Sequence, residues 1–342
     1  MFLSSIWGQK WQHRACGLPP QVPCLFIFGD SLSDNGNNMV LSTNVKASYL
    51  PYGVDFPFGT SGRCIAINGL NLPDRSELLG FENYIPPFGV GGCKDFMNGV
   101  NYASSAGGIL EMTASLLGQR YTMDLQLYNH KIIASRIAKE LGGADVASYN
   151  DYLNNYNSEG YNSSKIYTPE QFAQLLVQTY ETQLERLYRE GARKIAVFGL
   201  IRIGCMPSYL RTSKYKLNYE VQLFNKKLQK LIPKLNANLP GAKLTYINSY
   251  EIDSEDFESL VFSVLSVVRF FCSPLTCPCS NRDEHVYWDG AHYTEARARI
   301  FAERAYKRQL AVDAYPYDIS ELVKVPLDET DVGCSTCGTK IV

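Results

Sequence analysis

Short apolar runs along the chain alternate with longer stretches in which apolar residues recur at helical spacing. The short runs lie at residues 24–28, 100–103, 194–198 and 243–247, and each has the length of a buried strand. The helical stretches lie at residues 123–141, 172–189 and 218–235, and another follows Thr294. Because such alternation is typical of a parallel sheet covered by helices, the pattern predicts an α/β domain.

Local signals refine the ends of these predicted elements. "TPEQ" before the second helix supplies a capping Thr168, a proline in the first turn and a capping-box Gln171. Pro233 lies inside the third helix and is a candidate break. If the first helix ends near Leu141, only "GGADVAS" remains before Tyr149, and a parallel strand has little room there.

Composition excludes several classes of function. The chain has 342 residues, of which 45% are hydrophobic and 20% charged, as is ordinary for a soluble globular enzyme. Its net charge is −1 and its basic residues are scattered, so we expect no nucleic-acid partner. The longest apolar stretch, residues 261–272, contains Arg269 and is too short to cross a bilayer. No glycine-rich phosphate-binding motif opens a helix, which argues against a nucleotide.

Ten cysteines are too dilute for a disulfide scaffold, and their pairing cannot be read from the sequence. They stand at positions 16, 24, 64, 93, 205, 272, 277, 279, 334 and 337. The group at 272, 277 and 279, taken with the tail pair, is a possible set of zinc ligands. No second CxxC or histidine pair stands at finger-like spacing, however, so we predict no metal.

The sequence gives mixed signals about export. The N-terminus lacks the continuous apolar core of a secretory signal, because Lys10, His13 and Arg14 come too early. Against this, Asn162 begins an "NSS" glycosylation acceptor, and several cysteines suit an oxidising compartment.

A candidate nucleophile follows the first predicted strand, in "FGDSLSDNGNN" at residues 28–38. Ser31 in this turn would emerge at the carboxyl end of the sheet, where α/β folds bind ligands. A serine needs a base to take its proton, and the base needs a third group to fix its tautomer. Of four histidines, His292 has a carboxylate, Asp289, three residues before it. An isolated DxxH is more often a solvated loop pair, but together with Ser31 after a strand it favours catalysis.

Acyl chemistry also needs hydrogen-bond donors aimed at the developing oxyanion. The candidates are the backbone N–H of Ser31, a glycine N–H in "NYASSAGGI" and the side-chain amide of Asn150 in "SYNDYLNNY". Each of these segments, taken singly, is also typical of a turn or a strand end.

Five segments, in this order and approximate spacing, resemble the plant-type GDSL esterase/lipases of the SGNH hydrolase superfamily. They are "PCLFIFGDSLSDNGNN", "GVNYASSAGGI", "NDYLNNY", "RKIAVFGLIRIGCMPS" and "CSNRDEHVYWDGAHYTEA". The resemblance implies a three-layer α/β/α fold with a flavodoxin-like parallel sheet. It also implies ester hydrolysis through an acyl-enzyme, with Ser31 as nucleophile, His292 as base and Asp289 as its orienting carboxylate. The absence of a GxSxG elbow argues separately against the α/β-hydrolase fold.

The resemblance also implies the oxyanion donors and the cellular setting. Gly108 matches the glycine of the second family block, with the adjacent Gly107 leaving the register open, and Asn150 matches the amide of the third block. Members of the family are usually secreted and need no metal or organic cofactor. We therefore expect an N-terminal segment at 1–20, one hydrolase domain at 21–328 and a Cys-containing tail at 329–342.

The sequence departs from the family pattern at several places. Ser148 replaces the glycine of the usual Gly-x-Asn-Asp, and Tyr293 stands where proline usually follows the histidine. Residues 62–71 look like the Gly-Arg-Phe-Ser-Asn-Gly stretch of the family with extra residues inserted. Residues 261–279 are apolar where the family has a loop rich in glycine and cysteine. The activity that the resemblance predicts is hydrolysis of lipid or acetyl esters. We expect this activity to be impaired if the third block is truncated. The alternatives are a weakly active or noncatalytic binding protein and an acyltransferase.

Overall fold

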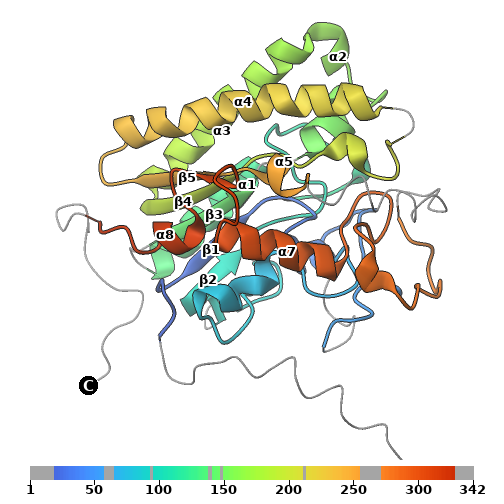
Figure 1. The fold of residues 1–342 in the computed structure, drawn as a ribbon, viewed down its shortest axis with the longest axis horizontal. Coiled ribbons are helices and arrows are strands. Elements are labelled where there is room, and N and C mark those ends of the chain that lie inside the picture. Colours follow the sequence, from blue (N-terminus) through green and yellow to red (C-terminus); the bar gives the residue numbers. More distant parts are fainter. Residues whose placement is uncertain are drawn as a thin grey trace, which may run out of the picture.

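The computed structural model describes residues 19–57, 65–92, 95–137, 141–146, 149–210, 213–254 and 271–327. These residues contain a six-stranded sheet in the order β2-β1-β3-β4-β5-β6, and Figure 1 labels β1 to β5. Neighbours from β2 to β5 run parallel, and β6 is antiparallel to β5. The strands are β1 (Leu25–Phe28), β2 (Gly99–Asn101), β3 (Leu141–Val146), β4 (Ala192–Phe198), β5 (Lys243–Ile247) and β6 (Ala314–Tyr315).

Helices connect and cover these strands. The α-helices are α1 (Met123–Ile137), α2 (Ser163–Ile166), α3 (Pro169–Arg189), α4 (Lys214–Asn238), α5 (Ser249–Ile252), α7 (Glu295–Tyr306) and α8 (Ile319–Leu322). A π-helical turn spans Tyr152–Tyr156. Short 3₁₀ segments lie at Asn37–Val40, Pro73–Leu79, Asp95–Asn98, Ser115–Leu117, Ile203–Cys205 and Arg282–Glu284.

The capping prediction for α3 is confirmed, whereas the predicted break in α4 is wrong. Thr168 Oγ1 accepts the backbone N–H of Gln171 at 3.3 Å, and the side chain of Gln171 accepts the backbone N–H of Thr168 at 2.9 Å. Pro233 lies inside α4, which continues to Asn238. Residues on both sides of Pro233, including Ile232, are buried, so tertiary packing offsets the hydrogen bond that proline removes.

The expectation that no strand fits before Tyr149 is also wrong. Helix α1 ends at Ile137, and β3 occupies Leu141–Val146 between β1 and β4. Two adjacent glycines, Gly142 and Gly143, disfavour continuation of the helix, and pairing on both sides stabilises the extended chain. Six residues in a strand rise about 20 Å, which is ample beside the four-residue β1. The supposed truncation of the third block is therefore absent.

Strand β1 is apolar at every position because helices pack on both of its faces. The rings of Phe26 and Phe28 contact the ring of His130 on α1, with centroids 4.8 and 5.3 Å apart. Ile27, which faces the other way, belongs to an apolar cluster against which Tyr306 of α7 packs. In Figure 1, α3 and α4 run side by side, and α7 lies in front of the strands.

The register of the sheet brings separate loops to one edge. Phe28, the last residue of β1, pairs with Asp145 near the end of β3. The segments that follow these two strands therefore emerge together, and they carry Ser31 and Asn150. The chain passes from β1 to β2 on one side and returns to β3 on the other, and such a switch in strand order opens a crevice at the carboxyl ends of the strands.

Within the described ranges, no helix has the length and apolar character needed to cross a bilayer. Most of the apolar stretch at 261–272 lies outside those ranges, since residues 255–270 are not described. The N-terminal 18 residues, residues 58–64, Ser148 and the tail from residue 328 also lie outside them.

Candidate active site

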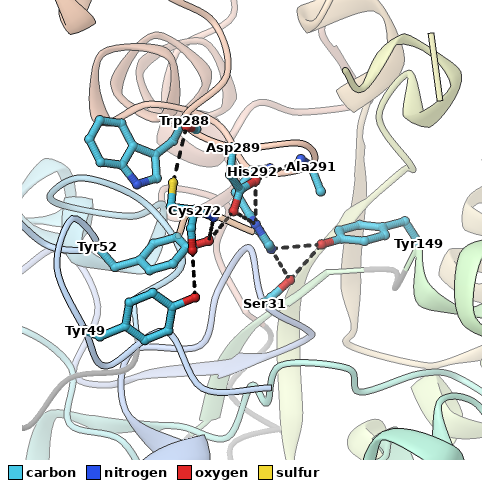
Figure 2. Close-up of polar contacts among 9 residues, drawn as sticks. All are labelled: Ser31, Tyr49, Tyr52, Tyr149, Cys272, Trp288, Asp289, Ala291 and His292. Carbon is cyan, nitrogen blue, oxygen red and sulfur yellow. Dashed lines mark hydrogen bonds and ion pairs between the residues drawn. The ribbon is translucent and has the colours of Figure 1, made fainter. Parts of the chain in front are cut away.

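Ser31, His292 and Asp289 form one continuous hydrogen-bonded chain (Figure 2). Ser31 Oγ lies 2.9 Å from His292 Nε2. His292 Nδ1 lies 3.0 and 2.9 Å from the two carboxylate oxygens of Asp289. All three side chains are buried, with exposed fractions of 5, 2 and 1%. With Nδ1–H donating to Asp289, Nε2 is left as an acceptor for the Ser31 proton.

A local turn sets the spacing of Asp289 and His292. Asp289 Oδ1 accepts the backbone N–H groups of Ala291 at 2.8 Å and of His292 at 2.7 Å. Trp288 N–H donates to the carbonyl of His292 at 2.7 Å and closes the turn. The carboxylate thus caps its own turn and also binds the imidazole, so residues 288–292 alone bring the pair together.

A second layer of hydrogen bonds holds the Asp289 carboxylate from behind. The Tyr52 hydroxyl donates to Asp289 Oδ2 at 2.7 Å, and itself accepts the backbone N–H of Cys272 at 3.0 Å. Burial, and secondly the charge of Asp289, raise the pKa of Tyr52 far above its ordinary value, so its hydroxyl stays a neutral donor. Burial raises the pKa of the Cys272 thiol to about 11, which keeps it protonated beside the carboxylate.

A buried carboxylate, that of Asp34, ties the loop that carries Ser31 to the second family block, the segment at residues 101–109. Asp34 Oδ1 accepts the backbone N–H groups of Gly36 and Asn37 at 2.9 and 2.8 Å. Its Oδ2 accepts both the N–H and the hydroxyl of Ser105, each at 2.9 Å. Because its charge is desolvated, the pKa of Asp34 is raised. These bonds place the segment that contains Gly107 and Gly108 beside the loop of Ser31.

The hydrogen bonds distinguish the two candidate oxyanion glycines. The N–H of Gly107 donates to the carbonyl of Ser104 at 2.8 Å and is occupied by that turn. The N–H of Gly108 has no acceptor among the described residues. A Cβ at Gly108 would lie 2.5 Å from the methyl carbon of Thr113, so the site has no space for a side chain there.

The amide of Asn150 lies where the loop that carries Ser31 and the segment that contains Gly107 and Gly108 meet. Its Nδ2 donates to the carbonyl of Gly107 at 3.0 Å and, at 3.3 Å, to the carboxylate of Asp30. The next residue, Asp151, accepts the N–H of Ile109 at 2.8 Å and binds the second block to the third. Burial raises the pKa of Asp151 to about 6.

Other sequence candidates lie apart from this cluster. His130, another of the four histidines, is buried against aromatic rings, and burial lowers its pKa to about 4. Asn162 is exposed beside α2 and accessible to modification. Over the ranges that can be described, no three His, Cys, Asp or Glu side chains gather as metal ligands. Cys334 and Cys337 of the zinc alternative lie outside those ranges.

The sequence did not indicate Tyr149, which touches the candidate nucleophile. Its hydroxyl lies 2.7 Å from Ser31 Oγ and 3.4 Å from His292 Nε2. Tyr52 was also missed, because a tyrosine in a loop has no spacing that links it to a distant carboxylate. For Tyr149, the one available signal was its place next to Asn150 in the third block.

Comparison with known proteins identifies the family of the chain. A family model described as GDSL-like Lipase/Acylhydrolase matches residues 25–305, which contain Ser31, Asp289 and His292. The chain belongs to this family. The GDSL esterase/lipase At1g29670 of Arabidopsis thaliana is 41% identical, covering 89% of this chain and 92% of the relative. The GDSL esterase/lipase At4g18970 of the same plant is 39% identical, covering 90% of this chain and 94% of the relative. The resemblance seen in the sequence is confirmed.

Proposed function

We propose that the protein hydrolyses carboxylic esters of lipid or acetyl type through an acyl-enzyme. Membership of the GDSL family and the names of its relatives support a carboxylic ester hydrolase. The observation that carries the assignment of roles is the continuous chain of hydrogen bonds from Ser31 through His292 to Asp289.

In the proposed reaction, Ser31 Oγ attacks the ester carbonyl while its proton passes to His292 Nε2. The tetrahedral intermediate then collapses, the bond to the alcohol oxygen breaks, and the leaving alcohol takes the proton from His292. Water repeats the sequence on the acyl-Ser31 ester, releasing the acid and restoring the serine. Asp289 keeps Nδ1 protonated and stabilises the imidazolium during both steps.

The negative charge of the intermediate would be bound by the N–H groups of Ser31 and Gly108 and by the amide of Asn150. The N–H of Gly107 is already used in a turn, which favours Gly108. Asn150 is held by the carbonyl of Gly107 at 3.0 Å, and its weaker contact of 3.3 Å with Asp30 is the one that a substrate oxyanion would replace.

We further propose the three-layer, flavodoxin-like arrangement of SGNH hydrolases for residues 21–328. The order 2-1-3-4-5 of the parallel strands supports it, as does packing of α1 and α7 on opposite faces of β1. Secretion with glycosylation at Asn162 is proposed on the usual location of the family and the exposure of that asparagine.

A fluorescent phosphonate and a p-nitrophenyl ester test the proposed function together. The wild-type protein should be labelled and should release p-nitrophenol, whereas Ser31→Ala should do neither, because it lacks the attacking oxygen. Ser31→Ala that retains wild-type turnover would refute the assignment. Labelling without turnover would instead indicate the noncatalytic alternative.

A further inference from the structure

Tyr149 approaches Ser31 from the side opposite Asp289 (Figure 2). Ser31 has a single hydroxyl proton, which points to His292 when Asp289 holds Nδ1–H. The bond of 2.7 Å between the two hydroxyl groups therefore uses the Tyr149 proton, and Ser31 Oγ accepts it. Burial, and secondly the charge of Asp30, raise the pKa of Tyr149 well above its ordinary value, so this donor stays protonated.

The same tyrosine forms part of the wall of an apolar cavity. The cavity lies between the carboxyl end of β4 and α7, and its volume is small, about 40 Å³. Its surface is almost wholly apolar, and its lining includes Leu32, Leu72, Phe198, Leu200, Ala298 and Phe301. Aliphatic chains suit such a surface, because it offers them burial and few polar partners.

The cavity stops short of the nucleophile because Tyr149 stands between them. Ser31 is not part of the described lining, although its neighbour Leu32 is. Tyr149 alone both lines the cavity and hydrogen-bonds Ser31 Oγ, among the residues that the structure describes. It is only 2% exposed and packs in the main core, so displacement of the ring would disturb well-packed neighbours.

We propose that Tyr149 limits the acyl chain of the ester substrate, closing the apolar cavity to Ser31 and restricting the protein to short acyl groups. This inference rests on the proposed function, since it requires an acyl group on Ser31. An acetyl group needs no space beyond the nucleophile, whereas a long chain extends toward the ring. The substrate class is thus esters of short carboxylic acids, and Tyr149 is a specificity-determining residue.

The test compares kcat/KM for p-nitrophenyl esters from acetyl to dodecanoyl. The wild-type protein should prefer acetyl or butanoyl esters and lose activity with octanoyl and longer chains. Tyr149→Ala should move the optimum to longer chains, with a gain of up to about fourfold for each methylene that the cavity buries. Tyr149→Phe keeps the ring and is the matched control, so its preferred chain length should not change.

A second substitution that fills the space opened in Tyr149→Ala tests the same inference in the opposite direction. In the Tyr149→Ala background, Ala298→Leu should remove the gain with long chains, because the added side chain occupies the opened space. An unchanged optimum in folded Tyr149→Ala would overturn the inference. If that variant does not fold, Tyr149→Leu offers a smaller opening with the same expected direction. If neither folds, the wild-type profile decides, since a preference for octanoyl or longer chains contradicts a closed cavity.

Failure of this inference can be told apart from failure of the proposed function. If phosphonate labelling and ester turnover depend on Ser31 but the preferred length does not depend on Tyr149, only the inference fails. If turnover does not depend on Ser31, the proposed function fails with it.

Discussion

The two flanks of Ser31 are built by different means. On one flank, Asp289 and His292 lie in a single turn, and the carboxylate accepts the N–H groups of that same turn. On the other flank, Asn150 depends on segments far apart in the chain, since its amide binds Gly107 and Asp30. The first flank is therefore set by local sequence, and the second by the register of β3 in the sheet.

Asp289→Asn should produce the largest change on the locally built flank. The Asn oxygen can still accept the turn N–H groups, but its NH₂ would face Tyr52 and His292 Nδ1. Nδ1 would then have to be an acceptor, which protonates Nε2 and leaves no base for Ser31. A comparable substitution in another Ser-His-Asp triad lowers kcat about 10⁴-fold.

Steady-state hydrolysis of p-nitrophenyl acetate measures this loss, and a thermal melt checks that the turn still folds. Tyr52→Phe is the graded control, because it removes one hydrogen bond to Asp289 without changing the tautomer of His292. Its loss should be about 2- to 10-fold, the range expected for a single hydrogen bond. An Asp289→Asn variant no worse than Tyr52→Phe would contradict the proposed role of the carboxylate.

The contrast between the flanks also explains what the sequence could predict. The apolar run of β1, the cap at Thr168 and the spacing of Asp289 and His292 are local features, and the sequence predicts each of them. Strand β3 was missed because its "GGA" has low strand propensity, and pairing with β1 and β4 decides its conformation. The contact of Tyr149 with Ser31 follows from that pairing, so the sequence offered only one indirect signal for it, its place next to Asn150.

Asn150→Ala tests the flank that depends on register, with a smaller expected effect. Because β3 is paired on both sides, we expect the Asn150 amide to be well placed, and loss of one oxyanion donor lowers kcat by about 10²- to 10³-fold. Asn154→Ala is the matched control. Its amide donates to Asn150 Oδ1 at 2.7 Å, so it supports the same side chain without reaching the substrate.

The kinetic pattern separates positioning from binding. Asn150→Ala should lower kcat with little change in KM, because the oxyanion exists only in the transition state. Asn154→Ala should cost less than Asn150→Ala. A loss of less than about tenfold in Asn150→Ala, well short of the usual penalty, would indicate a poorly placed donor and a weakened third block.

The smallest expected effect concerns the stability of the register-dependent flank. Burial raises the pKa of Asp151 from 3.8 to about 6 in the folded protein. Between about pH 4 and 6 the folded state therefore holds a proton that the unfolded state has released, and the free energy of unfolding should fall as pH rises through this window. Asp151→Asn removes this ionisation, so its stability should fall less steeply from pH 4 to 6 than that of the wild type. It should also be less stable overall, because an NH₂ group would meet backbone donors such as the N–H of Ile109.

Urea unfolding across this pH range measures both effects. The control is Asp124→Asn, which changes an exposed carboxylate of α1 and should keep the wild-type slope of stability against pH. Equal slopes in the wild type and Asp151→Asn would mean that the carboxylate joining the second and third blocks is already ionised at pH 4.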